Sequence, residues 1–429
     1  MNNYTMDLYE VKREILNFSK KMSSCTDKPT TKFVYDMLYG ITKSKSCLIS
    51  EISRELDEKV KLKNTIERLC DNLNNLSEEE FNIIDNNYIN EVKKKFPKEN
   101  PIALFDDSDI AKRYGKKFED LDQVIDASSQ DKEVVSGYHV CESVILTEKE
   151  KQPISVYSNI YSCQSDGFKS KNDYTIKSID KVIDTVGSKK KDKNDSEKID
   201  MVFDRGYDNN LIIKYVDDSS NYFVIRMQDR RNFLFKGKMK NGHQIAITRK
   251  GKIKMNVWFE DEEKECYVSH TKVTMPFNRK DYELVIVYGL SEEHPMILLT
   301  NRPIHSKEDV IKVVRLYFSR WRIEEYFRIK KQEYDFENMR VRTLKSINNL
   351  NLLLRLVMGL LSMLVEEIDR KLLTIKIIER SKSLRNKVIL YLSQIARGIG
   401  KILSFARCGI KEFQKIETRS KYRQLELRL

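Results

Sequence analysis

The stretch Tyr317–Lys331, YFSRWRIEEYFRIKK, constrains the fold of this chain more than any other. Tyr317, Arg320, Glu324 and Lys331 are separated by three, four and seven residues, so on an α-helix they return to nearly the same face. Apolar residues recur beside them at the same period and give the helix an edge to bury. Ordinary i,i+4 ion pairs would explain any single pair, but four specified types at this spacing arise by chance in only about one sequence in a hundred. The stretch therefore predicts one buried helix that holds a carboxylate between cations.

The composition favours a polyanionic partner. The chain has 429 residues, enough for two or three domains with a substantial core. Lys and Arg outnumber Asp and Glu by 78 to 65, which gives a formal net charge of +13. Such a balance favours nucleic acid as a partner, and an anionic membrane after it. A basic surface without a partner is the alternative.

Cysteine spacing and hydropathy predict a reduced, cytoplasmic protein. The seven Cys are scattered, no CxxC pair exists, and the five His do not follow them at zinc spacing. We therefore expect neither a structural zinc ion nor a disulfide framework. The N-terminus is too polar for a signal peptide. The most apolar run, Leu350–Val365, is interrupted by Arg355 and is too short to span a bilayer, so it predicts a buried core helix and no membrane contact.

Residues 1–97 are predicted to be helical throughout, because apolar residues recur at helical spacing in several segments. Ser77–Glu80, SEEE, is a capping-box signal for one of these helices. Basic residues on short helices could dock on DNA. A purely structural helical bundle is an equal alternative.

Residues 98–227 alternate between strand and helix patterns, which predicts an α/β domain with a mixed sheet. The expected strands are Ile102–Phe105, 134–147, Pro153–Ile160, 199–204 and Asn221–Met227, and the expected helices are Tyr174–Val186 and 208–218. Two of these strands deliver an acidic residue at their ends.

Residues 228–303 have alternating apolar residues and the turn pair Asn241-Gly242, which predict an all-β insertion with a hairpin at that pair. Rich in Lys and Arg, it could lie along a DNA backbone or act as a stabilising appendage. Trp258 within it could stack on a base, but a core position is the expected one. The chain is predicted to be helical again in residues 304–373 and 374–429, with a last helix over 412–429 and dimer contacts as one role.

Three acidic residues of the chain can form one site. Asp106 and Asp204 each follow an expected strand, and Glu324 lies on the expected helix, so the three can converge on two divalent cations. Two-metal sites suit phosphodiester chemistry, and oxygen ligands favour Mg²⁺ with Mn²⁺ as a substitute. Asp107 and Asp109 compete with Asp106 for the first position.

The chain resembles the DDE transposases of bacterial insertion sequences. Its fifteen-residue stretch matches the Tyr-x2-Arg-x3-Glu-x6-Lys signature of the insertion-sequence-four family, and ALFDDSDIAK and MVFDRGYD resemble the blocks that carry the two family aspartates. The resemblance covers roughly residues 100–345. It implies an α/β, ribonuclease H-like mixed sheet interrupted by the β-rich insertion, with helical N- and C-terminal regions.

The resemblance also implies the roles of six residues. The metal ligands and catalytic residues would be Asp106, Asp204 and Glu324, and the DNA-phosphate contacts would be Tyr317, Arg320 and Lys331. Two Mg²⁺ ions would serve strand cleavage and strand transfer.

The predicted function is therefore a cut-and-paste transposase. It would act as a homodimer on double-stranded DNA, the terminal inverted repeats and the target, at the nucleoid in a bacterial cytoplasm. Two alternatives remain: a ribonuclease H-like nuclease or resolvase, and a non-catalytic DNA-binding inhibitor of transposition. The expected regions are 1–97, helical and binding DNA ends, the two catalytic segments 98–227 and 304–373, the insertion 228–303, and the helical region 374–429.

Overall fold

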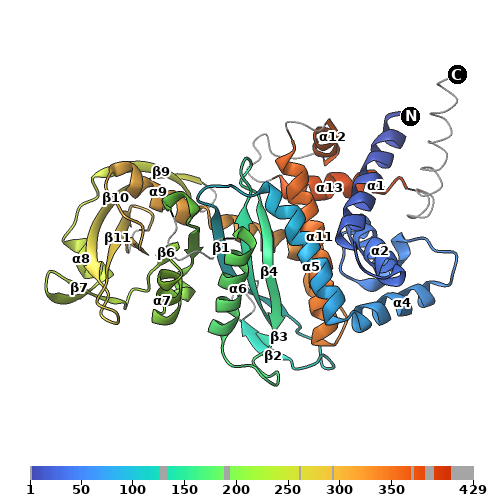
Figure 1. Ribbon diagram of the computed structural model, residues 1–429, viewed down its shortest axis with the longest axis horizontal. Coiled ribbons are helices and arrows are strands. Elements are labelled where there is room, and N and C mark those ends of the chain that lie inside the picture. The colour runs from blue at the N-terminus through green and yellow to red at the C-terminus, as the bar shows by residue number, and fades with distance from the viewer. Residues whose placement is uncertain are drawn as a thin grey trace.

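The computed structural model describes residues 2–125, 133–187, 194–259, 262–291, 294–368, 372–381 and 391–406. Three regions follow one another along the longest axis (Figure 1): N-terminal helices at one end, a sheet in the middle and a β-rich region at the other end. The last helix expected over 412–429 lies outside the described residues.

The N-terminal region is helical, as the apolar spacing predicts. Its helices are α1 (Asn2–Met22), α2 (Lys28–Ser44), α3 (Ile49–Glu55), α4 (Leu62–Asn75) and α5 (Glu78–Val92), followed by the 3₁₀ turn η1 (Lys93–Lys95). The capping box is present at the start of α5. The Ser77 hydroxyl accepts from the Glu80 N–H at 3.2 Å, and a Glu80 carboxylate oxygen accepts from the Ser77 N–H at 3.0 Å.

One apolar helix joins the N-terminal helices to the sheet. Helix α11 (Leu344–Glu366) contacts α2, α4 and α5 on one side and strand β4 (Pro153–Tyr161) on the other. It is long and apolar enough to cross a membrane, but 94% of its most apolar window is buried inside the protein. The expected core helix is thus confirmed. Helices α12 (Leu372–Ser381) and α13 (Leu392–Leu403) pack on α1, and α13 also reaches α2 and α11.

The central sheet has the strand order of a ribonuclease H-like fold. Its strands are β1 (Ile102–Ala111), β3 (Val134–Leu146), β4, β5 (Asp200–Phe203) and β6 (Tyr222–Arg226). They lie in the order β4-β3-β1-β5-β6, in which β4, β3 and β1 are antiparallel neighbours and β5 runs parallel to both β1 and β6. The predicted α/β fold with a mixed sheet is confirmed. The short strand β2 (Asp122–Ile125), which pairs with the start of β3, was not expected.

Helices cover both faces of this sheet. Helix α6 (Lys171–Val186) packs on β3 and β4, and α10 (Trp321–Gln332) packs on β1 and β4. Helix α9 (Lys307–Phe318) lies against β5 and β6, and α7 (Asn210–Asp218) against β6 and α6. Alternate residues of β1 point to opposite faces of the sheet. Neighbouring residues of this strand therefore face different helices.

The β-rich region extends the same sheet. Its strands are β7 (Asn232–Phe235), β8 (Lys238–Asn241), β9 (Ile253–Phe259), β10 (Glu262–Thr274), β11 (Asp281–Tyr288) and β12 (Met296–Thr300). Strand β12 pairs with β6, so the strands expected to form a separate insertion continue the central sheet edge to edge.

Two local predictions for this region are wrong. The hairpin turn lies at Lys236-Gly237, where both residues have positive φ, and not at Asn241-Gly242. The Asn241 side chain instead accepts from the Gln244 N–H at 2.9 Å and starts a short helix, α8 (Gly242–Ile247). Trp258 is 42% exposed rather than buried in the core, because it points outward from β9.

Candidate active site

The ends of two parallel strands bring two of the three acids side by side. Phe105 of β1 is paired with Phe203 of β5, and their rings stack with centroids 4.5 Å apart. Asp106 and Asp204 are the next residues on the two strands, and neighbouring strands lie about 4.8 Å apart. The sequence predicted that the first strand would end at Asp106, and this prediction is wrong. Strand β1 runs on to Ala111, because its second half pairs with β3 after its pairing with β5 has stopped.

The signature stretch forms two helices, and the prediction of one helix is wrong. Helix α9 ends just after Tyr317 and α10 begins just after Arg320. Between them the hydrogen bonds tighten to i,i+3: the Arg320 N–H donates to the Tyr317 carbonyl and the Ile323 N–H to the Arg320 carbonyl, both at 3.0 Å. The Ser319 hydroxyl also donates to a carbonyl of α9. Arg320 therefore lies at a junction, with Tyr317 on one helix and Glu324 on the other.

The Arg320 guanidinium lies among all three acids. Its Nη2 is 2.6 Å from Glu324 Oε1, its Nη1 is 3.6 Å from Asp106 Oδ2, and its Nε is 3.9 Å from Asp204 Oδ1. The Tyr317 hydroxyl donates to the same Asp204 oxygen at 3.0 Å. The Arg320 side chain is 15% exposed and that of Glu324 is 54% exposed, so the cluster opens to solvent on the α10 side. Residues from three elements thus meet around one cation.

The neighbouring carboxylates of Asp106 and Asp204 have opposite pKa shifts. Burial, together with the charges of Asp204 and Glu324, raises the pKa of Asp106 to about 7 despite the nearby Arg320. Burial also acts on Asp204, but Arg320 and the Tyr317 hydroxyl outweigh it and lower the pKa of Asp204. Burial and the Asp204 charge raise the pKa of Tyr317 to about 12, so the phenol stays a hydrogen-bond donor. Three crowded carboxylates with one cation between them form a site suited to further positive charge.

Lys331 and the two competing aspartates lie apart from this cluster. The Lys331 Nζ donates to the Asp109 carbonyl at 2.7 Å and pairs with Glu337 at 3.0 Å, and none of its described contacts is with the three acids. Asp107 and Asp109 alternate with Asp106 along β1 and therefore point to the opposite face. The structure thus brings Tyr317, Arg320 and the three acids together and places Lys331 further along α10, against the β1 backbone at Asp109.

A buried ion pair beneath the acids was missed by the sequence analysis. Glu142 of β3 lies directly opposite Asp106, and its Oε2 is 2.9 Å from the Nζ of Lys330 on α10. Their side chains are 0% and 1% exposed. Ser158 also donates to Glu142, and the Lys330 Nζ also donates to Asn351. One signal was available, namely a charged residue inside the apolar run 134–147.

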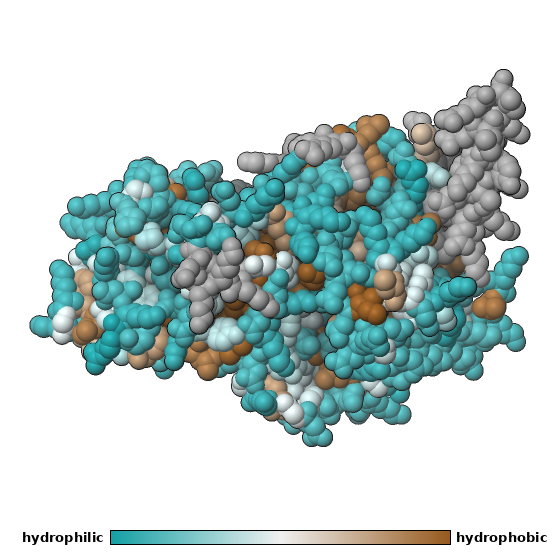
Figure 2. Space-filling view, viewed as in Figure 1, coloured by the Kyte–Doolittle hydropathy of each residue, from teal (hydrophilic) through white to brown (hydrophobic). Residues whose placement is uncertain are grey.

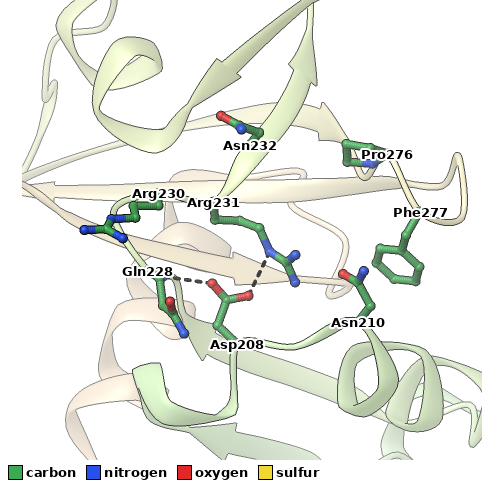
Figure 3. Close-up of a pocket in the computed structure, with 8 residues that line it drawn as sticks. All are labelled: Asp208, Asn210, Gln228, Arg230, Arg231, Asn232, Pro276 and Phe277. Carbon is green, nitrogen blue, oxygen red and sulfur yellow. Dashed lines mark hydrogen bonds and ion pairs between the residues drawn. The ribbon is translucent and has the colours of Figure 1, made fainter.

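A separate cavity of about 500 Å³ lies between the start of α7 and the β-rich region (Figure 3). It is lined by Asp208, Asn210, Gln228, Arg230, Arg231, Asn232, Pro276 and Phe277. Asp208 holds the two sides together, because it pairs with the Arg231 Nε at 2.8 Å and accepts from the Gln228 N–H at 2.9 Å. The three acids do not line this cavity.

The donor set of the three acids fits a divalent cation. All three residues offer carboxylate oxygens, the ligands that Mg²⁺ and Mn²⁺ prefer. Arg320 supplies the counter-charge between them. Among the described residues, the three-donor group with all ligand atoms within 4.8 Å of one another is a different one, Asp122, His139 and Cys163. The acids would have to close around a cation as Arg320 moves aside.

The fold and the site define a ribonuclease H-like α/β protein with an acidic site at the edge between two parallel strands. Residues 167–360 match the family model described as Transposase DDE domain. This segment contains Asp204, Glu324 and the signature stretch, while Asp106 precedes it. This segment is less than half of the chain, and the match supports a transposase function in general terms.

Other similarities are weak. A search of curated proteins found no match. Among solved structures, the NurA nuclease from Sulfolobus solfataricus is similar at 9% identity and a TM-score of 0.26, over 63% of this chain and 93% of that chain. A TM-score at this level supports no conclusion on fold or activity.

Proposed function

We propose that this protein is a cut-and-paste transposase of the insertion-sequence-four type. It would cleave DNA strands and transfer them at the ends of its own insertion sequence. The observation that carries the proposal is the position of Arg320, whose guanidinium lies within 4 Å of carboxylate oxygens from Asp106, Asp204 and Glu324. These acids come from β1, the end of β5 and α10, so the fold has to be intact for them to meet.

The three acids are proposed as ligands of two Mg²⁺ ions, with Mn²⁺ as a substitute. When bound, such ions supply Lewis-acid stabilisation of the attacking and leaving oxygens in phosphoryl transfer. Tyr317 would position Asp204 through its hydrogen bond. Arg320 would turn from the acids to a DNA phosphate, which a guanidinium contacts with two N–H groups. Lys331 would contribute charge to the DNA from its place near the end of α10.

The proposed reaction is a series of in-line displacements at phosphorus. A water molecule attacks the phosphodiester at the element end and breaks its P–O3′ bond, which leaves a 3′-hydroxyl on one product and a 5′-phosphate on the other. That hydroxyl then attacks a second phosphodiester, on the opposite strand or in the target duplex, and forms a new P–O bond while the 3′-oxygen of the attacked strand leaves. Because attacking group and leaving group are both oxygens, one site can catalyse each step.

The remaining regions would supply DNA and subunit contacts. Residues 1–97 are proposed to bind the terminal inverted repeats, and the basic β-rich region 228–303 to lie along the duplex. The region 374–429 would contribute to a homodimer in the synaptic complex. With these roles the protein would act at the nucleoid of a bacterial cytoplasm, and the net charge of +13 favours DNA as a partner.

The test uses a duplex made from the DNA that flanks the gene, where the proposal expects inverted repeats. Glu324→Gln should abolish Mg²⁺-dependent cleavage while the affinity for the duplex stays within about twofold of wild type. The matched control is Glu325→Gln on the same helix, since Glu325 pairs with Arg328 at 2.5 Å and not with the other acids. The control should cleave normally. Cleavage by the Glu324 variant at the wild-type rate would refute the assignment.

The products separate the alternatives. Cleavage without strand-transfer products, under conditions that permit both, would identify a nuclease or resolvase. Tight duplex binding with no effect of Mg²⁺ and no cleavage would identify a DNA-binding inhibitor.

A further inference from the structure

A second cluster of metal-ligand side chains lies on the opposite face of β1 from Asp106. Its members are Asp122 of β2, His139 of β3 and Cys163, two residues beyond the end of β4. One ligand atom from each of the three lies within 4.8 Å of the others. The strand register explains this meeting, because β2 and β4 both pair with β3 on the side away from β1: Asp122 is paired with Gly137 and Tyr161 with His139, so the chain that leaves β4 runs directly to Asp122.

The hydrogen bonds of His139 leave one ring nitrogen for a cation. Its Nδ1 lies 2.7 Å from Asp109 Oδ1, and a carboxylate can only accept, so Nδ1 carries a proton. The other nitrogen, Nε2, lies 3.4 Å from Asp122 Oδ2. Nε2, the ring nitrogen that does not face Asp109, therefore points at the Asp122 carboxylate, where a cation bound to both would lie.

The Asp122 carboxylate is already fixed in position. One oxygen accepts from the Gln123 N–H and the other from the Cys163 N–H, both at 2.7 Å. Each oxygen keeps a further lone pair. The second bond also holds the backbone of Cys163 beside the carboxylate. Asp122 and His139 are both less than 10% exposed, so the cluster is built into the sheet edge and not into a surface loop.

The spacing and the donor types match zinc. In a tetrahedral zinc site, bonds of about 2.0–2.1 Å to nitrogen and oxygen place those two atoms about 3.3–3.4 Å apart. The Nε2–Oδ2 separation here is 3.4 Å. A nitrogen, an oxygen and a sulfur ligand suit Zn²⁺ and disfavour Mg²⁺, which takes oxygen ligands.

We propose that Asp122, His139 and Cys163 bind one Zn²⁺ ion, with Asp109 orienting the histidine through its Nδ1–H. A carboxylate on the second nitrogen of a ligand histidine is the usual partner in zinc sites. The ion would join β2, β3 and the chain between β4 and α6. Strand β2 has only four residues, so its pairing alone holds this edge weakly. The proposal is independent of the transposase function, because the two sites share no ligand.

An aromatic wall closes one side of the proposed site. The Tyr161 ring lies 5.5 Å from that of His139 and stacks on Tyr174 of α6 at 4.0 Å and on Phe168 at 6.1 Å. A buried ring beside a metal site excludes water and holds the ligands in place. Zinc binding is therefore expected to stabilise the packing of α6 on the sheet.

The first experiment measures metal content in the full chain, purified without a histidine tag and dialysed against Mg²⁺. Mass spectrometry should find about one zinc per chain in wild type. The variants Cys163→Ser and His139→Gln should retain at least tenfold less, and Asp109→Asn should weaken zinc affinity by about 10–100-fold. The matched control is Cys70→Ser, a half-buried cysteine of α4, which should keep the wild-type zinc content.

The second experiment needs no variant and therefore does not depend on variant folding. Iodoacetamide labelling of the wild-type chain is followed by peptide mass spectrometry, with and without added Zn²⁺. Zinc should slow alkylation of Cys163 at least tenfold and leave Cys25, which is exposed, unchanged. Cobalt in place of zinc should give a thiolate charge-transfer band. Equal alkylation of Cys163 in both conditions, or no zinc retained by wild type, would overturn the proposal.

Discussion

Substitution of the buried Lys330 beneath the acids is expected to lower stability more than substitution of any exposed charged residue on α10. Lys330 and Glu142 are essentially inaccessible to water, and their ion pair of 2.9 Å fastens α10 to β3. Lys330→Met keeps the volume of the side chain but leaves the Glu142 carboxylate buried with Ser158 as its described partner. Breaking a buried pair from one side typically costs about 3–5 kcal/mol. We expect a loss in that range.

A double-mutant cycle separates the pair from the packing around it. In Lys330→Met/Glu142→Gln no buried charge is left, and the Gln carbonyl can still accept from Ser158. The double variant should therefore regain part of the loss, with a coupling energy of about 2–3 kcal/mol. The matched control is Arg328→Met on the same helix, whose ion pair with Glu325 is half exposed. Its cost should stay below about 1 kcal/mol.

Urea unfolding followed by circular dichroism gives the four free energies. A second readout links stability to the site: because α10 also carries Glu324, a loosened helix should weaken Mg²⁺ binding even where the chain stays folded. A cost below about 1 kcal/mol for Lys330→Met, or no coupling in the cycle, would refute the argument that this pair anchors α10.

Three further outcomes follow from the structure. Burial lowers the pKa of Lys112 from 10.5 to about 8, so between these pH values the unfolded chain holds a proton that the folded chain lacks, and stability should rise with pH by up to about 3 kcal/mol. Urea titrations at pH 8 and 10.5 should show this slope in wild type and lose it in Lys112→Met. Ser77→Ala removes the capping box with Glu80 and should cost about 1 kcal/mol in the same assay, whereas a cost near zero would contradict the cap. Mg²⁺ at a hundred times its Kd should stabilise wild type by about 2.7 kcal/mol, visible as a raised Tm, and an equal shift in Glu324→Gln would exclude that residue as a ligand.

The elements whose structure depends on residues close by in the chain could be predicted from the sequence. The capping box at Ser77, the apolar run of α11 and the strand pattern of β5 each specify their structure within a dozen residues. The wrong predictions concern elements whose structure depends on residues that are distant in the sequence. Strand β1 continues past Asp106 through a polar stretch because β3 offers it backbone partners. Asn241-Gly242 suits both a hairpin and a helix start, and the earlier turn at Lys236 decided between them.

The candidate sites, too, could be predicted where they depend on nearby residues and not where they depend on distant ones. The meeting of Asp106, Asp204 and Glu324 could be predicted, because a recognisable apolar strand segment precedes each aspartate and Glu324 lies in a distinctive helical stretch. The role of Arg320 at a helix junction could not, since the spacing of the stretch is equally compatible with one straight helix. The zinc-type cluster was excluded by sequence spacing, because His139 and Cys163 are joined only by the β3–β4 pairing. Spacing rules for zinc describe short loops and do not detect ligands assembled across a sheet.

Because side chains alternate between the two faces of β1, one short polar segment can contribute to two proposed sites with different chemistry. Asp106 faces α10 and the other carboxylates, whereas Asp109 points to the α6 face and binds His139. The first face offers oxygen atoms alone and opens to solvent through Glu324, as an exchangeable Mg²⁺ site requires. The second face offers nitrogen, oxygen and sulfur from residues behind a wall of aromatic rings, which suits a slowly exchanging ion. Ligand type, and not affinity alone, would therefore direct each metal to its own face of the sheet. A chelator specific for zinc should then lower the stability of the β2 edge without displacing Mg²⁺ from the three acids.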